Sequence, residues 1–144
     1  MAITIRKVSI EEVHSVSLQI PEFINPHPIE TYKKRLKNAN YLVLGAFDGV
    51  IPIGFKVGYG LNEDIFYSWM GAVLTNYRRQ NIAKRLAQAQ EKWAKENGYN
   101  KIRFKTKNKL RAMILFAIKN DFNIIKIETR EEVEENRIIM EKFL

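Results

Sequence analysis

The chain has 144 residues, 46% of them hydrophobic and 28% charged, which is typical of a globular protein and predicts a single domain over residues 1–144. It contains no cysteine, which excludes disulfides, thiolate metal sites and a cysteine nucleophile. The formal net charge of +8 favours polyanionic partners, and it is equally compatible with a solvated lysine-rich surface. We expect a cytoplasmic protein without a membrane span, because the sequence has no N-terminal apolar signal segment and no apolar run of about 20 residues.

The first half of the chain predicts two short helices and a set of antiparallel strands. Ser9 and Glu12 have the spacing of a capping box at the start of a helix. Three prolines exclude helix over residues 21–28. The turn at Asp48-Gly49 between two apolar runs indicates a β-hairpin. The expected elements are strands at 4–7, 41–47, 50–59 and 65–74 and helices at 9–20 and 29–36.

The second half predicts alternating helices and strands. A helix begins at Ile82, and Gly98 is its expected stop. Residues 101–106 alternate strictly between basic and less polar side chains, as a half-buried strand does. Asn108 is the expected N-cap of the next helix. Strands are expected at 122–128 and 137–143, so the fold class is α/β, with a mixed, mostly antiparallel sheet and a strand–helix–strand crossover.

The junction at residues 72–86 is the most informative stretch of the sequence. An apolar strand ends, a short polar turn follows, and a helix begins. The first amides of a helix have no intrahelical partner, and the helix dipole adds about half a positive charge there. Arg78, Arg79, Lys84 and Arg85 add four cations. This combination predicts a site for phosphate oxygens, and the alternative is a basic, solvated turn.

The same turn resembles a known cofactor-binding loop. Its pattern, Tyr-Arg-x-x-x-Ile-Ala-x-x-Leu, resembles the acyl-CoA pyrophosphate loop of the GNAT superfamily, which is usually written Q/R-x-x-G-x-G/A. Arg78 takes the first position and Ala83 the last, while Asn81 stands where glycine is usual. Asparagine tolerates left-handed backbone geometry better than most residues, so a similar turn is expected.

Other segments resemble signatures of a bacterial branch of this superfamily, in the same order along the chain. They are Gly54–Tyr59, Tyr67–Val73, Gln90–Ala94, Gly98-Tyr99, Lys105–Asn108 and Lys119–Phe122. In the last segment Asp121 replaces the usual glycine. The resemblance covers nearly the whole chain. It implies a GNAT-like sheet flanked by about four helices, and an N-acetyltransferase that uses acetyl-CoA as co-substrate and no metal.

The resemblance also implies which residues hold acetyl-CoA, in an opening between the fourth and fifth strands. Backbone N–H groups near Val73 and Leu74 would polarise the thioester carbonyl. The turn from Arg79 to Lys84 would hold the pyrophosphate. Asn108 would contact the pantetheine arm, or would only cap the next helix. The full set of expected cofactor-binding residues is Val73, Leu74, Arg78, Arg79, Gln80, Asn81, Ile82, Ala83, Lys84 and Asn108.

The acceptor implied by the resemblance is a primary amine that attacks the thioester directly. An alkylamine with a pKa near 10.4 is neutral in about one molecule per thousand at pH 7, so a base or a water relay is useful. The catalytic candidates are Glu22, in the proline-rich loop, and Tyr67, on the strand before the turn. His27, Glu63 and Asp64 are alternatives.

Relatives place a tyrosine on the helix after the fifth strand as an acid toward the departing thiolate. Here that neighbourhood is Leu115-Phe116-Ala117, without a hydroxyl. An alkyl thiol with a pKa around 8.5 is a fair leaving group, so we expect protonation by water.

Two other functions remain open at this stage. The basic strand 101–105 could meet phosphates of a nucleic acid, although no helix-turn-helix or RNP signature accompanies it, which makes nucleic acid the less favoured partner. A GNAT-shaped protein that binds CoA without turnover is suggested by Asn81, Phe116 and Asp121. The acceptor is expected to be a small-molecule or peptide amine. A homodimer is compatible with the resemblance, because GNAT proteins often dimerise.

Overall fold

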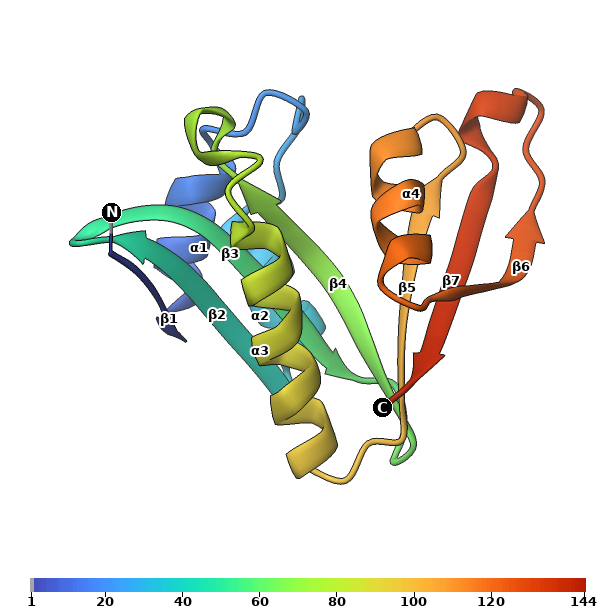
Figure 1. The fold of residues 1–144 in the computed structure, drawn as a ribbon, viewed down its shortest axis with the longest axis horizontal. Helices are drawn as coiled ribbons and strands as arrows, with labels where there is room; N and C mark the ends of the chain where they lie inside the picture. Colours follow the sequence, from blue (N-terminus) through green and yellow to red (C-terminus); the bar gives the residue numbers. More distant parts are fainter. Residues whose placement is uncertain (1) are drawn as a thin grey trace.

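A computed structural model describes residues 2–144. Its seven strands form one sheet in the order β1-β2-β3-β4-β5-β7-β6 (Figure 1). The elements are β1 (Ile3–Lys7), α1 (Ile10–Ser17), α2 (Ile29–Leu36), β2 (Tyr41–Asp48), β3 (Ile51–Gly60), β4 (Ile65–Val73), the 3-10 turn η1 (Thr75–Tyr77), α3 (Ile82–Glu96), β5 (Lys101–Lys107), α4 (Arg111–Lys119), β6 (Asn123–Glu128), the 3-10 turn η2 (Val133–Glu135) and β7 (Arg137–Phe143). All neighbouring strands are antiparallel except β4 and β5, which are parallel. The predicted mixed sheet with four helices is confirmed.

Local signals position two helix ends as predicted. The Ser9 hydroxyl accepts the Glu12 amide at 3.2 Å, and the Glu12 carboxylate accepts the Ser9 amide at 3.2 Å, which completes the capping box. After α3, Gly98 has a φ of 91°. Only glycine adopts this conformation without strain, so the helix stops there.

The predicted cap of α4 is wrong. The helix begins at Arg111, and Leu110 occupies the N-cap position without a side-chain bond. Asn108 lies earlier, and its Nδ2 donates to the carbonyl of Val133 at 3.2 Å. The side chain therefore joins the end of β5 to the loop before β7, a tertiary contact that local propensity does not encode.

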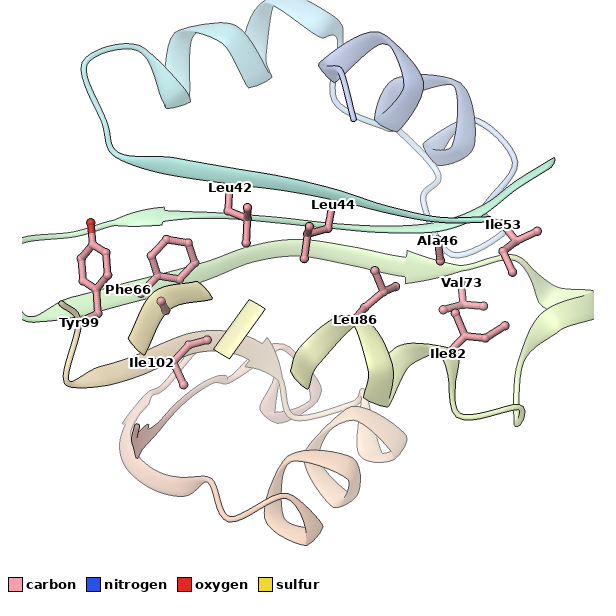
Figure 2. Packing of buried hydrophobic residues seen from close by; sticks show 11 residues of the cluster. Leu42, Leu44, Ala46, Ile53, Phe66, Val73, Ile82, Leu86, Tyr99 and Ile102 are labelled. Carbon is pink, nitrogen blue, oxygen red and sulfur yellow. The ribbon is translucent and has the colours of Figure 1, made fainter. Parts of the chain in front are cut away.

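Helices cover both faces of the sheet. Helices α1 and α2 lie on one face, and α3 and α4 lie on the other (Figures 1 and 2). The cluster between α3 and the sheet includes Ile53, Phe66, Leu86 and Ile102, all 2% exposed or less (Figure 2). Burying side chains of this size stabilises the fold by about 2 kcal/mol each. No helix within residues 2–144 is long and apolar enough to cross a membrane.

Strand β4 contains a bulge that changes which face its side chains cover. The register of β4 against β3 slips between Ser68 and Met70, so Trp69 has no partner on β3. Trp69 and Met70 both pack against the cluster beneath α1 and α2. In a regular strand two successive side chains would face opposite sides. The bulge therefore directs an extra aromatic residue to the α1/α2 face, and it lies just beyond the point where β4 stops pairing with β5.

Gly58, which lies beside the bulge, has no room for a side chain. A Cβ on Gly58 would lie 2.8 Å from the carbonyl oxygen of Tyr67 and 2.7 Å from Gln90 Nε2. We expect Gly58→Ala to lower the free energy of unfolding by about 2 kcal/mol, as overpacking typically does. Chemical denaturation measures it. Gly71→Ala is the matched control, because its nearest contact would be an ordinary 3.4 Å. Equal stability of the two variants would contradict this account.

Candidate active site

Strands β4 and β5 pair along only part of their length. The parallel register covers Ile65 to Tyr67 on β4 and Lys101 to Arg103 on β5, and the strands then diverge (Figure 1). The amide of Leu74 donates to Ile53 of β3 at 2.8 Å. Since antiparallel strands alternate the direction of their peptide groups, those of Val73 face away from β3. The end of β4 therefore presents an open edge toward β5.

This geometry separates two residues that the sequence groups together. Val73 faces the open edge, where its amide can meet a carbonyl oxygen. The Leu74 amide is already bonded inside the sheet, so it is not available as an oxyanion donor in this structure.

Arg78 ties two distant segments to the end of β4. Its Nε donates to the Val73 carbonyl at 3.0 Å, and its two terminal nitrogens donate to the two carboxylate oxygens of Glu22 at 2.8 Å each. Glu22 belongs to the loop between α1 and α2. Bidentate pairs of this kind are geometrically specific, although the partial exposure of both side chains weakens the attraction by screening.

The turn after η1 exposes backbone amides. Arg79 and Asn81 have φ values of 62° and 64°, in the left-handed region. The first intrahelical bond of α3 joins the Arg85 amide to the Asn81 carbonyl at 3.0 Å, and no side chain caps the helix. The amides of residues 82–84 therefore have no intrahelical acceptor, and they point out of a helix end that carries partial positive charge.

A cavity of about 370 Å³ opens beside these amides. It lies between the start of α3 and α4, next to Val73 at the open edge of β4. Its lining residues come from β4, the turn, α3 and the end of α4: Val73, Tyr77, Arg78, Arg79, Asn81, Ile82, Ala83, Lys84, Phe116, Lys119 and Asn120.

Seven of the ten expected cofactor-binding residues are in that lining. The other three are Leu74, Gln80 and Asn108. Gln80 is exposed, and its Nε2 lies 3.5 Å from the Asn76 carbonyl. The remaining lining residues were not expected to bind the cofactor. Of these, Lys119 and Asn120 lie in a segment whose family signature was visible in the sequence.

Tyr77 joins the turn after β4 to the hairpin between β2 and β3. Its hydroxyl donates to Asp48 Oδ2 at 3.0 Å, and this carboxylate raises the pKa of the Tyr77 phenol. Tyr77 therefore supports the turn as well as lining the cavity.

The opposite face of β4 carries an aromatic cluster, which contains Tyr67. The rings of Tyr59 and Tyr67 are 5.6 Å apart, and those of Tyr59 and Trp69 are 6.2 Å apart. The guanidinium of Arg35 lies 4.6 Å from the Trp69 ring, and its Nη1 donates to the Tyr59 hydroxyl at 3.1 Å. His27, 5.5 Å from the Trp69 ring, brings the proline-rich loop to the same cluster.

Neither of the two catalytic candidates, Glu22 and Tyr67, has a pKa near 7. The hydrogen bonds from Arg78 lower the pKa of Glu22 from 4.5 to about 2, so this carboxylate binds protons weakly while the pair persists. Burial raises the pKa of Tyr67 above its ordinary value of 10.0, so the phenol keeps its proton at neutral pH. General-base catalysis by Glu22 requires the ion pair to open.

Three of the four cations of β5 lie in ion pairs, with two carboxylates between them. Arg103 Nη2 lies 2.7 Å from Glu141, and Lys101 lies 4.0 Å from the same carboxylate. Lys107 pairs with Glu135 at 3.3 Å. These pairs reduce the positive charge that the strand offers to nucleic acid.

The fold matches solved acetyltransferase structures along its whole length. The ribosomal-protein-S18-alanine N-acetyltransferase from Escherichia coli superposes with a TM-score of 0.84 at 15% identity, covering 99% of this chain and 94% of that one. Ard1 from Thermoplasma volcanium gives 0.85 at 18% identity, covering 100% and 99%. The PaiA N-acetyltransferase from Thermoplasma acidophilum, in complex with coenzyme A, gives 0.78 at 23% identity, covering all of both chains. At these identities the likeness defines the fold.

The sequence profile of the Acetyltransferase (GNAT) family matches residues 11–122. The chain belongs to that family. A comparison with curated protein sequences finds no match.

The Arg78–Glu22 pair can be tested by titration. The Glu22 carboxyl should titrate with a pKa of about 2, and in Arg78→Ala its pKa should return toward 4.5. Because the pKa is lowered in the folded protein, the pair stabilises the fold above pH 4.5, and this contribution disappears as the pH falls toward 2. NMR of the side-chain carboxyl carbon measures both values.

Arg79→Ala is the matched control for this titration, because Arg79 makes no bond to Glu22. It should leave the Glu22 pKa at about 2. The ion pair would be ruled out by a Glu22 pKa that is the same in wild type and in Arg78→Ala.

Proposed function

We propose that this protein transfers an acetyl group from acetyl-CoA to a primary amine of a small molecule or a peptide, by direct attack in a ternary complex. One observation carries the proposal. The unpaired amides at the start of α3 and the open edge of β4 border the same cavity. Family membership supports the transfer, and the acceptor is inferred from chemistry.

The residues present fit the two ends of this co-substrate. The amides of residues 82–84, with Arg79 and Lys84, would hold the diphosphate, because they combine unpaired donors with positive charge. The open edge of β4 offers unpaired peptide groups for the amides of the pantetheine arm. The amide of Val73 would polarise the thioester carbonyl. When bound, acetyl-CoA supplies an activated acyl group.

The aromatic cluster would receive the acceptor amine on the opposite face of the sheet. Tyr67 is protonated there, so its hydroxyl can orient the amine or a water next to it. Glu22 is our candidate base, with its role conditional on the pair with Arg78. A phosphate that attracts the Arg78 guanidinium would release the carboxylate, and its pKa would rise toward 4.5.

Binding of acetyl-CoA should depend on the turn at Asn81. Asn81→Asp places a negative charge beside the diphosphate and should weaken binding about tenfold, or about 1.4 kcal/mol. Asn81→Gly keeps the left-handed backbone without strain and should preserve or improve it. Titration calorimetry measures both affinities. Lys92→Glu, on the exposed side of α3, is the charge control and should change little. Equal affinities in Asn81→Asp and wild type would remove the turn from the site.

A change at Tyr67 should affect the reaction of the acceptor amine without affecting the binding of acetyl-CoA. Tyr67→Phe should lower kcat/KM for an accepted amine at least tenfold, through loss of one hydrogen bond in the reacting complex. The same change should leave acetyl-CoA affinity unaltered. A thiol-release assay over small amines and N-terminal peptides measures the first effect, with Tyr41→Phe, an exposed residue at the start of β2, as control.

The assays also distinguish the competing functions. Binding of acetyl-CoA without thiol release for any amine would favour a CoA-binding protein that does not turn over. Salt-sensitive binding to nucleic acid without acetyl-CoA binding would overturn the proposal.

A further inference from the structure

Lys56 is a half-buried cation that the proposed function has not used. It lies on β3 between Gly54 and Gly58. A Cβ on Gly54 would be 3.5 Å from Leu86 of α3, and one on Gly58 would be 2.7 Å from Gln90 of α3. Residues two apart on a strand share a face, so the Lys56 side chain also lies on the α3 face of the sheet.

The ammonium group of Lys56 lies over β4. Lys56 is paired in register with Gly71 of β4, and its Nζ lies 3.5 Å from the position of a Gly71 Cβ. Gly71 is two residues from Val73, or about 7 Å along the strand. The absent side chain of Gly71 therefore leaves Nζ over β4, on the same face as the cavity that Val73 lines.

No acid neutralises Lys56. Its nearest influential carboxylate, Glu91 of α3, is paired with Lys142 at 2.7 Å. Lys142 also donates to the carbonyl of Asn120, a lining residue of the cavity, at 3.0 Å. None of the ion pairs within residues 2–144 involves Lys56.

The surroundings of Lys56 shift its acid strength. Burial lowers the pKa of Lys56 from 10.5 to about 8, and the charge of Glu91 opposes this shift only in part. The facing residues on the neighbouring strands, Leu44 and Gly71, bring no charge. Lys56 is therefore mostly an ammonium at pH 7, and it gives up its proton more readily than an exposed lysine does.

We propose that Lys56 stabilises the thiolate that leaves from the thioester and gives it a proton. This inference rests on the proposed function. Two residues of α4 line the cavity: Phe116, which offers no proton, and Lys119, which is the last residue of the helix. If the Val73 amide holds the thioester carbonyl, the sulfur would lie on or near the face of β4 over which the Lys56 ammonium group is placed, at Gly71.

The acceptor nitrogen forms a bond to the acyl carbon, and the carbon–sulfur bond breaks with its electron pair on sulfur. Lys56 donates one proton to that sulfur, giving the thiol. The acceptor nitrogen loses one proton to the base, Glu22 or a water beside it, and Lys56 regains one from water. Because a lysine with a pKa of about 8 and a thiol with a pKa near 8.5 are closely matched, the transfer is nearly thermoneutral.

The test uses CoA itself, so that no acceptor is needed. Thiolate formation by bound CoA is followed by ultraviolet absorbance against pH in wild type and Lys56→Met. In wild type the pKa of the bound thiol should be about one unit below its free value, a tenfold preference for the thiolate. In Lys56→Met this lowering should disappear. Lys92→Met, an exposed lysine on α3, should behave as wild type.

A second variant separates charge from proton donation. Lys56→Arg keeps a cation that does not give up its proton, so the bound thiol pKa should stay low while thiol release with an accepted amine slows at least tenfold. A thermal melt against pH confirms that each variant folds. As the pH rises from 8 to 10.5, the free energy of unfolding of wild type should increase relative to that of Lys56→Met. In this range the unfolded chain binds more protons at Lys56 than the folded protein does.

The outcomes are distinct. An equal thiol pKa in wild type and Lys56→Met, with CoA bound in both, overturns the role of Lys56 and leaves the proposed function standing. Failure of wild type to bind CoA overturns the proposed function and this inference with it.

Discussion

The site depends on the short pairing between β4 and β5. A parallel pair buried between helices is normally hydrogen-bonded along its length, and here it ends after three residues. Beyond that point β5 pairs with β7 on its other side, while β4 stays bonded to β3. Peptide groups on the inner edge of β4 therefore lack a strand partner. Such groups are costly to bury unless something else bonds to them.

The chain satisfies one of these groups itself. The carbonyl of Val73 accepts a hydrogen bond from Arg78, so a side chain substitutes for the missing strand at the mouth of the opening. The amides at the start of α3 remain unpaired within the helix. Unpaired peptide groups and positive charge therefore lie at the same end of the opening between β4 and β5. This makes the region suited to a long, amide-bearing anion.

Local sequence signals predicted the parts of this arrangement that local physics determines. The capping box at Ser9 and the stop at Gly98 depend on residues within one helical turn, and both are as expected. The left-handed backbone of Asn81 also follows from the residue itself. The role of Asn108 was missed because its partner, Val133, is 25 positions away in the sequence.

The site was predicted less completely than the fold for the same reason. The pair of Arg78 with Glu22 joins residues 56 positions apart, and nothing in either segment indicates it. Lys56 occurs in an alternating strand where a lysine ordinarily faces solvent, and only the packing of α3 over β3 makes it unusual. The open edge itself depends on which strands pair, which no single segment determines.

The guanidinium of Arg78 also has a consequence for the order of events. It holds a loop near the aromatic cluster while facing a cavity suited to anions, and three of its five N–H donors are already bonded to Val73 and Glu22. Any anion that recruits it weakens the restraint on residues 21–28. By thermodynamic reciprocity, a molecule that draws that loop away strengthens anion binding by the same factor. Binding of an anion on one face of the sheet and movement of the loop on the other would then be coupled through one side chain, without a change of fold.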